Sequence, residues 1–183
     1  QEVMIAIDEL FRSGTVKPVP VWFDGMIQEA TAIHASHPNY LTKALSKSLL
    51  KDDGENPFTS EWFRPVKGRE LRESIIMDNS PCIVLATSGM LNGGPVMEYF
   101  KNWAHEDRNS LCFVGYQAEG TLGRRLQKGF GEVPMLINGK TEIVKIGCEM
   151  VTIDGFSGHS DRRQLPDFVD RINPPPKNII SHH

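Results

Sequence analysis

The sequence predicts an α/β fold built on a mainly parallel sheet with helices on both faces. Several β-prone runs are apolar throughout, which is typical of parallel strands buried on both sides. Segments with helical periodicity separate these runs. The pair Asn138 and Gly139 lies between two further β-prone runs and predicts a small β-hairpin near residues 133–146.

The first third of the chain predicts three helices and one strand. Apolar residues at helical spacing favour a helix over residues 3–11, which Gly14 would end in the left-handed conformation. Two more helical patterns are separated by Pro38, and Asn39 is available as an N-cap. The expected strand is 19–24, the two helices are 27–33 and 39–50, and a polar surface loop follows at 51–61.

From residue 68 onward, predicted helices and strands alternate. The helices are expected at 68–79, 94–106, 121–129 and 161–172. The strands are expected at 81–89, 110–116, 148–154 and 177–181. Thr121 should cap the short basic helix, and Pro166 must either kink or restart the last one.

Length and composition favour one compact domain over residues 1–183. The net charge of −3 does not indicate a partner that is a polyanion, so any nucleic-acid site must be a local patch of the surface. Cys82, Cys112 and Cys148 lie beside apolar runs without a CxxC pair, which predicts buried, reduced thiols in an intracellular setting. No signal peptide and no apolar run of about 18 residues is found, so a soluble, cytoplasmic protein without a membrane partner is expected. The chain starts without Met and ends abruptly, which we interpret as a fragment of a longer protein.

Three glycine-rich segments follow predicted strands, and ligands of parallel sheets gather at such exits. The first holds Ser88, Gly93 and Gly94 before a helix, where backbone N–H groups favour an anion, although a tight turn explains these glycines equally well. The second places Arg124 near another helix start. A solvated basic face explains Arg124 about as well as a bound phosphate does.

The third exit, GFSGHSD, surrounds His159 with small residues that allow a substrate to approach closely. Ser157 and Ser160 offer hydroxyl groups, and Asp161 is placed to orient the imidazole. A histidine near neutral pH is suited to general acid catalysis, which contributes about 10²–10⁴-fold to a rate. A lone histidine is nevertheless more often an ordinary surface or core residue.

The remaining histidines carry weaker signals. His34 and His37 are spaced for a shared metal but lack a third ligand nearby, so an exposed helix end is favoured. His105 ends a helix, where a cation suits the helix dipole. His183 follows the run KNIIS and could lie at a strand exit, or it could be the remnant of a purification tag.

The ordered segments ATSGMLNGGP, VGYQAEGTLGRRL, DGFSGHSDRRQL and KNIISHH resemble the β-CASP region of metallo-β-lactamase-fold RNA-processing nucleases. The likeness is greatest to archaeal homologues of the cleavage and polyadenylation specificity factor endonuclease. It covers essentially the whole chain. It implies a Rossmann-like β-CASP fold and a longer zinc-dependent ribonuclease of the mRNA-processing or RNA-turnover type, endo- or exonucleolytic.

The resemblance also implies roles for individual residues. His159 matches the histidine that contacts the scissile phosphate and acts as general acid. His183 falls where a zinc ligand is expected. Ser88, Gly93, Gly94, Arg124, Ser157 and Ser160 are then candidate contacts to the backbone of single-stranded RNA.

The chain departs from the family pattern because it contains no HxHxDH motif. A catalytic zinc takes about three protein ligands, so His183 alone cannot hold the two zinc ions that the family implies. We therefore expect no zinc in this fragment and no RNA cleavage by it alone. Its expected partners are single-stranded RNA and the metallo-β-lactamase domain of the same protein, with a homodimer of the longer protein as a further arrangement. The alternative is a non-catalytic module that binds RNA or a protein partner.

Overall fold

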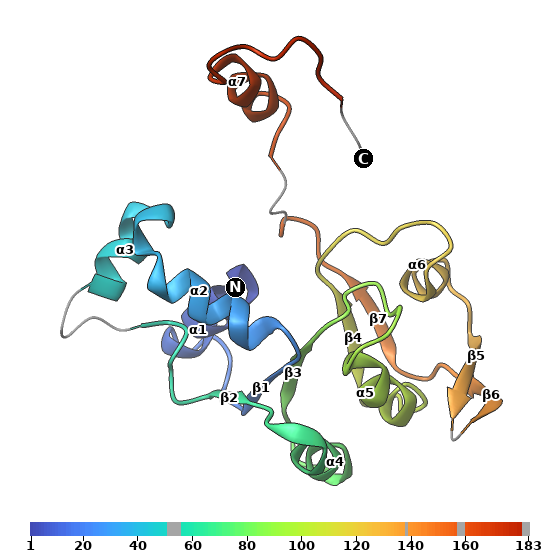
Figure 1. The fold of residues 1–183 in the computed structure, drawn as a ribbon. Helices are drawn as coiled ribbons and strands as arrows, with labels where there is room; N and C mark the ends of the chain where they lie inside the picture. The colour runs from blue at the N-terminus through green and yellow to red at the C-terminus, as the bar shows by residue number, and fades with distance from the viewer. Residues whose placement is uncertain (51–55, 138, 157–159, 181–183) are drawn as a thin grey trace.

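The computed structural model describes residues 1–50, 56–137, 139–156 and 160–180, and shows an α/β fold (Figure 1). The predicted class, with parallel strands, covering helices and an antiparallel hairpin, is confirmed. Within the described residues, however, the parallel strands form two hydrogen-bonded sheets instead of one.

The first sheet is parallel and has the order β2-β1-β3. Its strands are β1 (Val21–Asp24), β2 (Phe63–Pro65) and β3 (Ile83–Ala86). Successive residues of a strand point to opposite faces, so Val21 and Phe23 pack with Met4 and Phe11, whereas Trp22 joins a cluster around Ile75. Both faces of the central strand are therefore covered.

The helices that supply these clusters lie on opposite sides of the sheet (Figure 1). They are α1 (Glu2–Arg12) and α2 (Ile27–Ser36) on one side, and α4 (Gly68–Met77) and α5 (Val96–Trp103) on the other. Gly14, with φ of 70°, follows α1 as predicted.

The second parallel sheet pairs β4 (Ser110–Phe113) with β7 (Glu149–Thr152). Between these strands in sequence lie α6 (Leu122–Gln127) and a hairpin of β5 (Glu132–Ile137) and β6 (Lys140–Lys145). Apolar side chains of α6, β4 and the hairpin pack in one cluster with residues of α5 and of neighbouring loops, and its buried members are Leu91, Phe100, Ala104, Phe113, Leu126, Val133, Met135, Val144 and Cys148. Gly139 has φ of 78°, which fits the predicted tight turn, while Asn138 lies outside the described residues.

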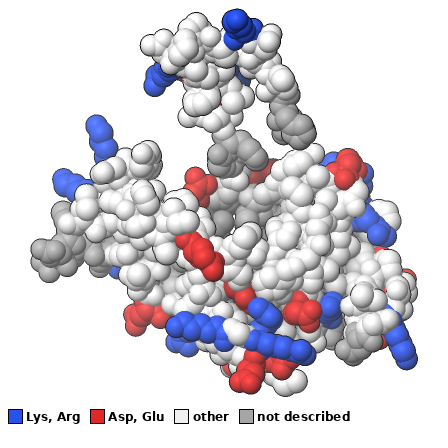
Figure 2. Space-filling view, viewed as in Figure 1, with Lys and Arg blue, Asp and Glu red and all other residues white. Residues whose placement is uncertain are grey.

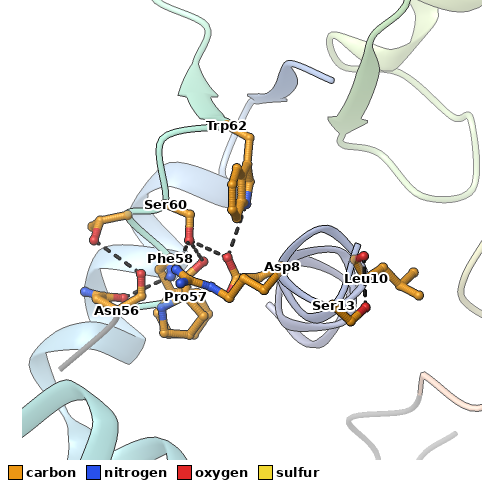
Figure 3. A network of polar contacts seen from close by, with 10 residues as sticks. Asp8, Leu10, Ser13, Asn56, Pro57, Phe58, Ser60 and Trp62 are labelled. Atoms are coloured by element: carbon orange, nitrogen blue, oxygen red, sulfur yellow. Dashed lines mark hydrogen bonds and ion pairs between the residues drawn. The ribbon is translucent and has the colours of Figure 1, made fainter. Parts of the chain in front are cut away.

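A polar network fastens α1 to the segment that precedes β2 (Figure 3). The buried carboxylate of Asp8 accepts hydrogen bonds from Ser60 Oγ, from Trp62 Nε1 at 3.2 Å and from Arg12 Nε at 2.7 Å. The Arg12 guanidinium also lies over the Trp62 ring, 5.5 Å from its centroid. These contacts satisfy a carboxylate that would be costly to bury alone.

Helix α7 (Gln164–Asp170) and the residues after it stand apart from both sheets in Figure 1. Leu165 and Phe168 are exposed there. Pro166 lies in the first turn of α7, where its missing N–H removes no helical hydrogen bond. Across the described parts of the chain, no helix combines the length and apolar character needed to cross a membrane.

Three local predictions differ from the structure, and one strand was not predicted. Residues 177–180 form no strand, because a β-prone run needs a neighbouring strand to satisfy its backbone and none of the described segments pairs with it; Ser181 lies outside the described residues. Asn39 lies inside a short 3₁₀ helix (Pro38–Tyr40), and α3 (Lys43–Leu50) begins after Thr42, whose Oγ1 accepts from Leu45 N–H at 3.4 Å. Cys112 is exposed, unlike Cys148. Strand β2 was not predicted.

Candidate functional site

The first glycine-rich exit folds back on itself after β3. Ser88 N–H donates to Gly93 O at 3.2 Å, and Val96 N–H donates to Thr87 O at 3.0 Å. Gly94 has φ of 76°, and a Cβ there would lie 2.7 Å from Thr87 O. Only glycine fits this position without distortion, so the tight turn is sufficient to explain why residue 94 is a glycine.

The second exit is joined to the first by Gln117. This buried side chain donates through Nε2 to Gly89 O at 2.9 Å and to Gly115 O at 3.1 Å. A further bond runs from Gly123 N–H to Met90 O at 3.2 Å. The structure therefore brings two of the three predicted exits into direct contact.

The predicted cap of α6 is confirmed. Thr121 Oγ1 accepts from Arg124 N–H at 3.2 Å and donates to Ala118 O at 2.7 Å. The Arg124 side chain turns back to Glu119, with Nε 3.0 Å from a carboxylate oxygen, and Lys128 contacts the other oxygen at 2.8 Å. Hydrogen bonds from Lys128 and then Arg124 lower the pKa of Glu119. Much of the positive charge near Arg124 is thus already paired.

The second and third exits line a common pocket of about 400 Å³ at the carboxyl ends of β4 and β7. It lies where parallel sheets are expected to bind ligands. Its walls come from the two loops after these strands and from α6, and consist of Val114, Gly115, Tyr116, Gln117, Arg124, Gln127, Thr152, Ile153, Asp154, Gly155 and Phe156. Arg124 is the predicted site residue found in this wall.

The third exit is described only up to Phe156 and again from Ser160. His159, Ser157 and His183 lie outside the described residues, so their roles stay predictions. Ser160 is exposed. Asp161 Oδ1 accepts from the backbone N–H groups of Arg163 at 2.7 Å and Gln164 at 2.8 Å, and so fixes the start of α7.

Asp24 forms a buried polar centre that the sequence reasoning missed. It ends β1, and its carboxylate accepts from Arg72 Nε at 2.7 Å, from Arg72 NH2 at 3.0 Å and from the Tyr99 hydroxyl at 2.9 Å. Burial alone would raise the pKa of Asp24, but the hydrogen bonds from Arg72 and Tyr99 outweigh it and lower that pKa. Burial, and then the bond to Asp24, raises the pKa of Tyr99. The position of Asp24 at the end of a predicted strand was the sequence signal that could have indicated this centre.

Charges on the visible face of the molecule are mixed. Figure 2 shows Lys and Arg side chains interspersed with Asp and Glu, which accords with the small net charge. Among residues 1–50, 56–137, 139–156 and 160–180, no three His, Cys, Asp or Glu side chains gather closely enough to hold a metal ion.

The chain was compared with models of protein families, and two of them match it. Residues 1–126 match the model described as the Beta-Casp domain. The chain belongs to the β-CASP family. Residues 143–183 of this β-CASP protein match a second model, described as the Zn-dependent metallo-hydrolase RNA specificity domain. The predicted resemblance is confirmed.

Relatives of this β-CASP chain carry the name transcription termination factor FttA. The protein of Methanosarcina mazei is 56% identical over 184 aligned positions, which span 100% of this chain and 29% of the relative. That of Pyrococcus horikoshii is 50% identical and covered to 28%, and that of Methanocaldococcus jannaschii is 47% identical and covered to 29%. The chain therefore spans less than a third of the length of these relatives.

Proposed function

We propose that this chain is the β-CASP part of a longer zinc-dependent ribonuclease that acts on RNA in transcription termination. Two matches support the proposal: one to the RNA specificity model at residues 143–183, and one to archaeal termination factors over the whole chain. The pocket at the exits of β4 and β7, whose lining includes the first two residues of GFSGHSD, is the structural observation that carries it. Such a role belongs inside the cell.

In this proposal, residues 1–183 act as one β-CASP-type unit and form one wall of the RNA cleft. The contacts to the RNA backbone come from Ser88, Gly93, Gly94, Arg124, Ser157 and Ser160. His159 donates a proton to the leaving oxygen as its bond to phosphorus breaks and a water-derived hydroxyl is added. Backbone contacts of this kind hold the strand in place without selecting its sequence.

The described residues do not fit a catalytic zinc. Such a site takes about three protein ligands, and the part of the chain that the structure describes brings no such set together. We therefore assign the ligands of the two implied zinc ions mainly to the rest of the longer protein, with His183 as the contribution of this chain. The same protein's metallo-β-lactamase domain is then the partner across the cleft, and two copies of the longer protein would form the homodimer.

The decisive experiment replaces His159 by alanine in the longer protein. Cleavage of a labelled single-stranded RNA should fall by about 10²–10⁴-fold while RNA affinity stays nearly unchanged. His105→Ala is the matched control, because His105 is exposed and lies beyond α5, away from the third exit. An equal loss of cleavage and binding would assign His159 to binding or folding instead.

The second candidate function is a non-catalytic module that binds RNA or a protein partner. The mixed surface charge and the absence of HxHxDH from these 183 residues favour it for the isolated chain. Incubating the chain with zinc and labelled single-stranded RNA separates the two functions. Metal-dependent cleavage by the chain alone would contradict our assignment of the zinc ligands.

A further inference from the structure

The pocket at the exits of β4 and β7 has the dimensions and lining of a small-molecule site. Its volume of about 400 Å³ falls within the range of about 300–1,000 Å³ typical of ligand pockets. Its lining includes the aromatic side chains Tyr116 and Phe156, from the loops after β4 and β7, and polar groups of Arg124, Thr152 and Asp154. An aromatic wall with a few polar groups is suited to a flat, partly polar ligand.

Tyr116 is the unusual member of this lining. Its side chain is 68% exposed, although it lies only three residues after the end of β4. It has no hydrogen-bond or ring partner among the residues that the structure describes. An exposed aromatic ring at the mouth of a pocket offers a stacking surface, and every nucleobase presents a face that can stack on it.

The charges of the pocket argue against a bare phosphate. Among the described residues of the lining, Arg124 carries the positive charge, and it already pairs with Glu119 while its NH1 contacts Gln127 Oε1 at 3.4 Å. Gln127 in turn donates to Thr152 Oγ1 at 3.0 Å, which holds this wall in place. Asp154 adds a negative charge. A neutral group that donates hydrogen bonds is therefore favoured over an anion.

Stacking on Tyr116 does not distinguish one base from another, but a hydrogen bond to Asp154 can. It has no hydrogen-bond or ion-pair partner within the described ranges, so its two oxygens can accept from a ligand. Carboxylates accept from the amino group of cytosine, whereas the corresponding position of uracil is a carbonyl oxygen. The pair Tyr116 and Asp154 thus favours a base that carries an amino group.

We propose that this pocket binds one unstacked nucleobase of single-stranded RNA, with Tyr116 stacking on the base and Asp154 accepting from its amino group. The inference rests on the proposed RNA-binding function and adds a base-selective subsite to it. The phosphates on either side of this nucleotide stay outside the base pocket, at its Arg124 edge, in line with the backbone contact proposed above for Arg124. RNA in which bases are paired would not bind here, because a base must leave its stack to enter.

The test compares short labelled RNAs of equal length in binding to the full 183-residue chain. One RNA carries cytosines, one uracils, and one is abasic. The cytosine RNA should bind about tenfold more tightly than the abasic one, and Tyr116→Ala should remove this advantage. Tyr40→Ala is the matched control, since Tyr40 is 88% exposed and lies outside the pocket. Asp154→Asn should remove the preference for cytosine over uracil.

Each outcome decides one part of the proposal. Equal binding of cytosine and abasic RNA by the wild-type chain would overturn the subsite and leave backbone binding intact. If Tyr40→Ala weakened binding as much as Tyr116→Ala, the subsite would likewise fail. If no RNA bound at all, the proposed function would fail, and titration of free cytidine against the ring signals of Tyr116 in nuclear magnetic resonance would judge the pocket alone.

Discussion

The Gln117 side chain lies directly against the backbone of Gly123. A Cβ at Gly123 would overlap Gln117 Oε1 and would lie 2.9 Å from its Cδ. The other end of the same amide holds the first two strand exits together through Gly89 O and Gly115 O. The small size of residue 123 therefore allows two loops of the candidate site to stay in contact.

Gly123→Ala should destabilise the chain by about 1–3 kcal/mol, because the added methyl group must displace Gln117 from its two carbonyl partners. Thermal unfolding followed by circular dichroism measures the change. Gly131→Ala is the control, since a Cβ there meets nothing within 4 Å. Equal stability of the two variants would show that Gln117 moves aside without cost.

Arg72→Met should destabilise the chain by about 3 kcal/mol at neutral pH, because it leaves the buried Asp24 carboxylate with Tyr99 as its remaining side-chain donor. Urea denaturation measures the loss. Arg69→Met removes the exposed pair with Glu73, in which Arg69 is 86% exposed, and should have a much smaller effect because solvent screens this pair. A similar effect of both changes would contradict a special role for the buried pair.

The stability of the chain should depend on the ionisation of Asp24 in acid. Its pKa is lower in the folded chain than the ordinary value of 3.8, so its stabilisation is present above about pH 4 and is lost as the pH falls through the lowered folded pKa. Asp24→Asn lacks this contribution at every pH. The difference in unfolding free energy between wild type and Asp24→Asn should therefore narrow below pH 4, as measured by denaturation at a series of pH values.

Thr121→Ala should cost about 1 kcal/mol, because Arg124 N–H loses the Oγ1 atom that caps α6. Thr121→Ser keeps the oxygen and should recover most of the stability. Chemical denaturation of the two variants provides the comparison. The cap would be unimportant if both variants unfolded at the same denaturant concentration.

The sequence predicted features whose cause lies within a few residues. Thr121 was expected to cap a short helix and does so, and Gly139 was expected in a tight turn and has the positive φ that such a turn requires. The first two glycine-rich exits follow β3 and β4 as expected, and the third is described up to Phe156 and again from Ser160. In each case, the local residue types restrict the backbone without help from distant parts of the chain.

Features that depend on distant contacts were not predicted. Strand β2 has only three residues, including Pro65, and owes its conformation to β1. The Asp24 network joins residues 48 and 75 positions apart, so the local sequence offers Asp24 at a strand exit as a signal but does not predict its partners Arg72 and Tyr99. Cys112 was expected to be buried, but it lies on the exposed side of β4.

The pairing of β4 with β7 has a consequence for synthesis of the chain on the ribosome. The first sheet is complete once Ala86 has emerged, whereas β4 must wait for Glu149–Thr152 before it gains a partner. In that interval its apolar residues, such as Phe113, depend on α5, α6 and the hairpin for cover. From the synthesis of Phe113 until that of Thr152, a nascent chain therefore carries β4 without its partner, and an unpaired strand edge is a site for chaperone binding or for pairing with another chain.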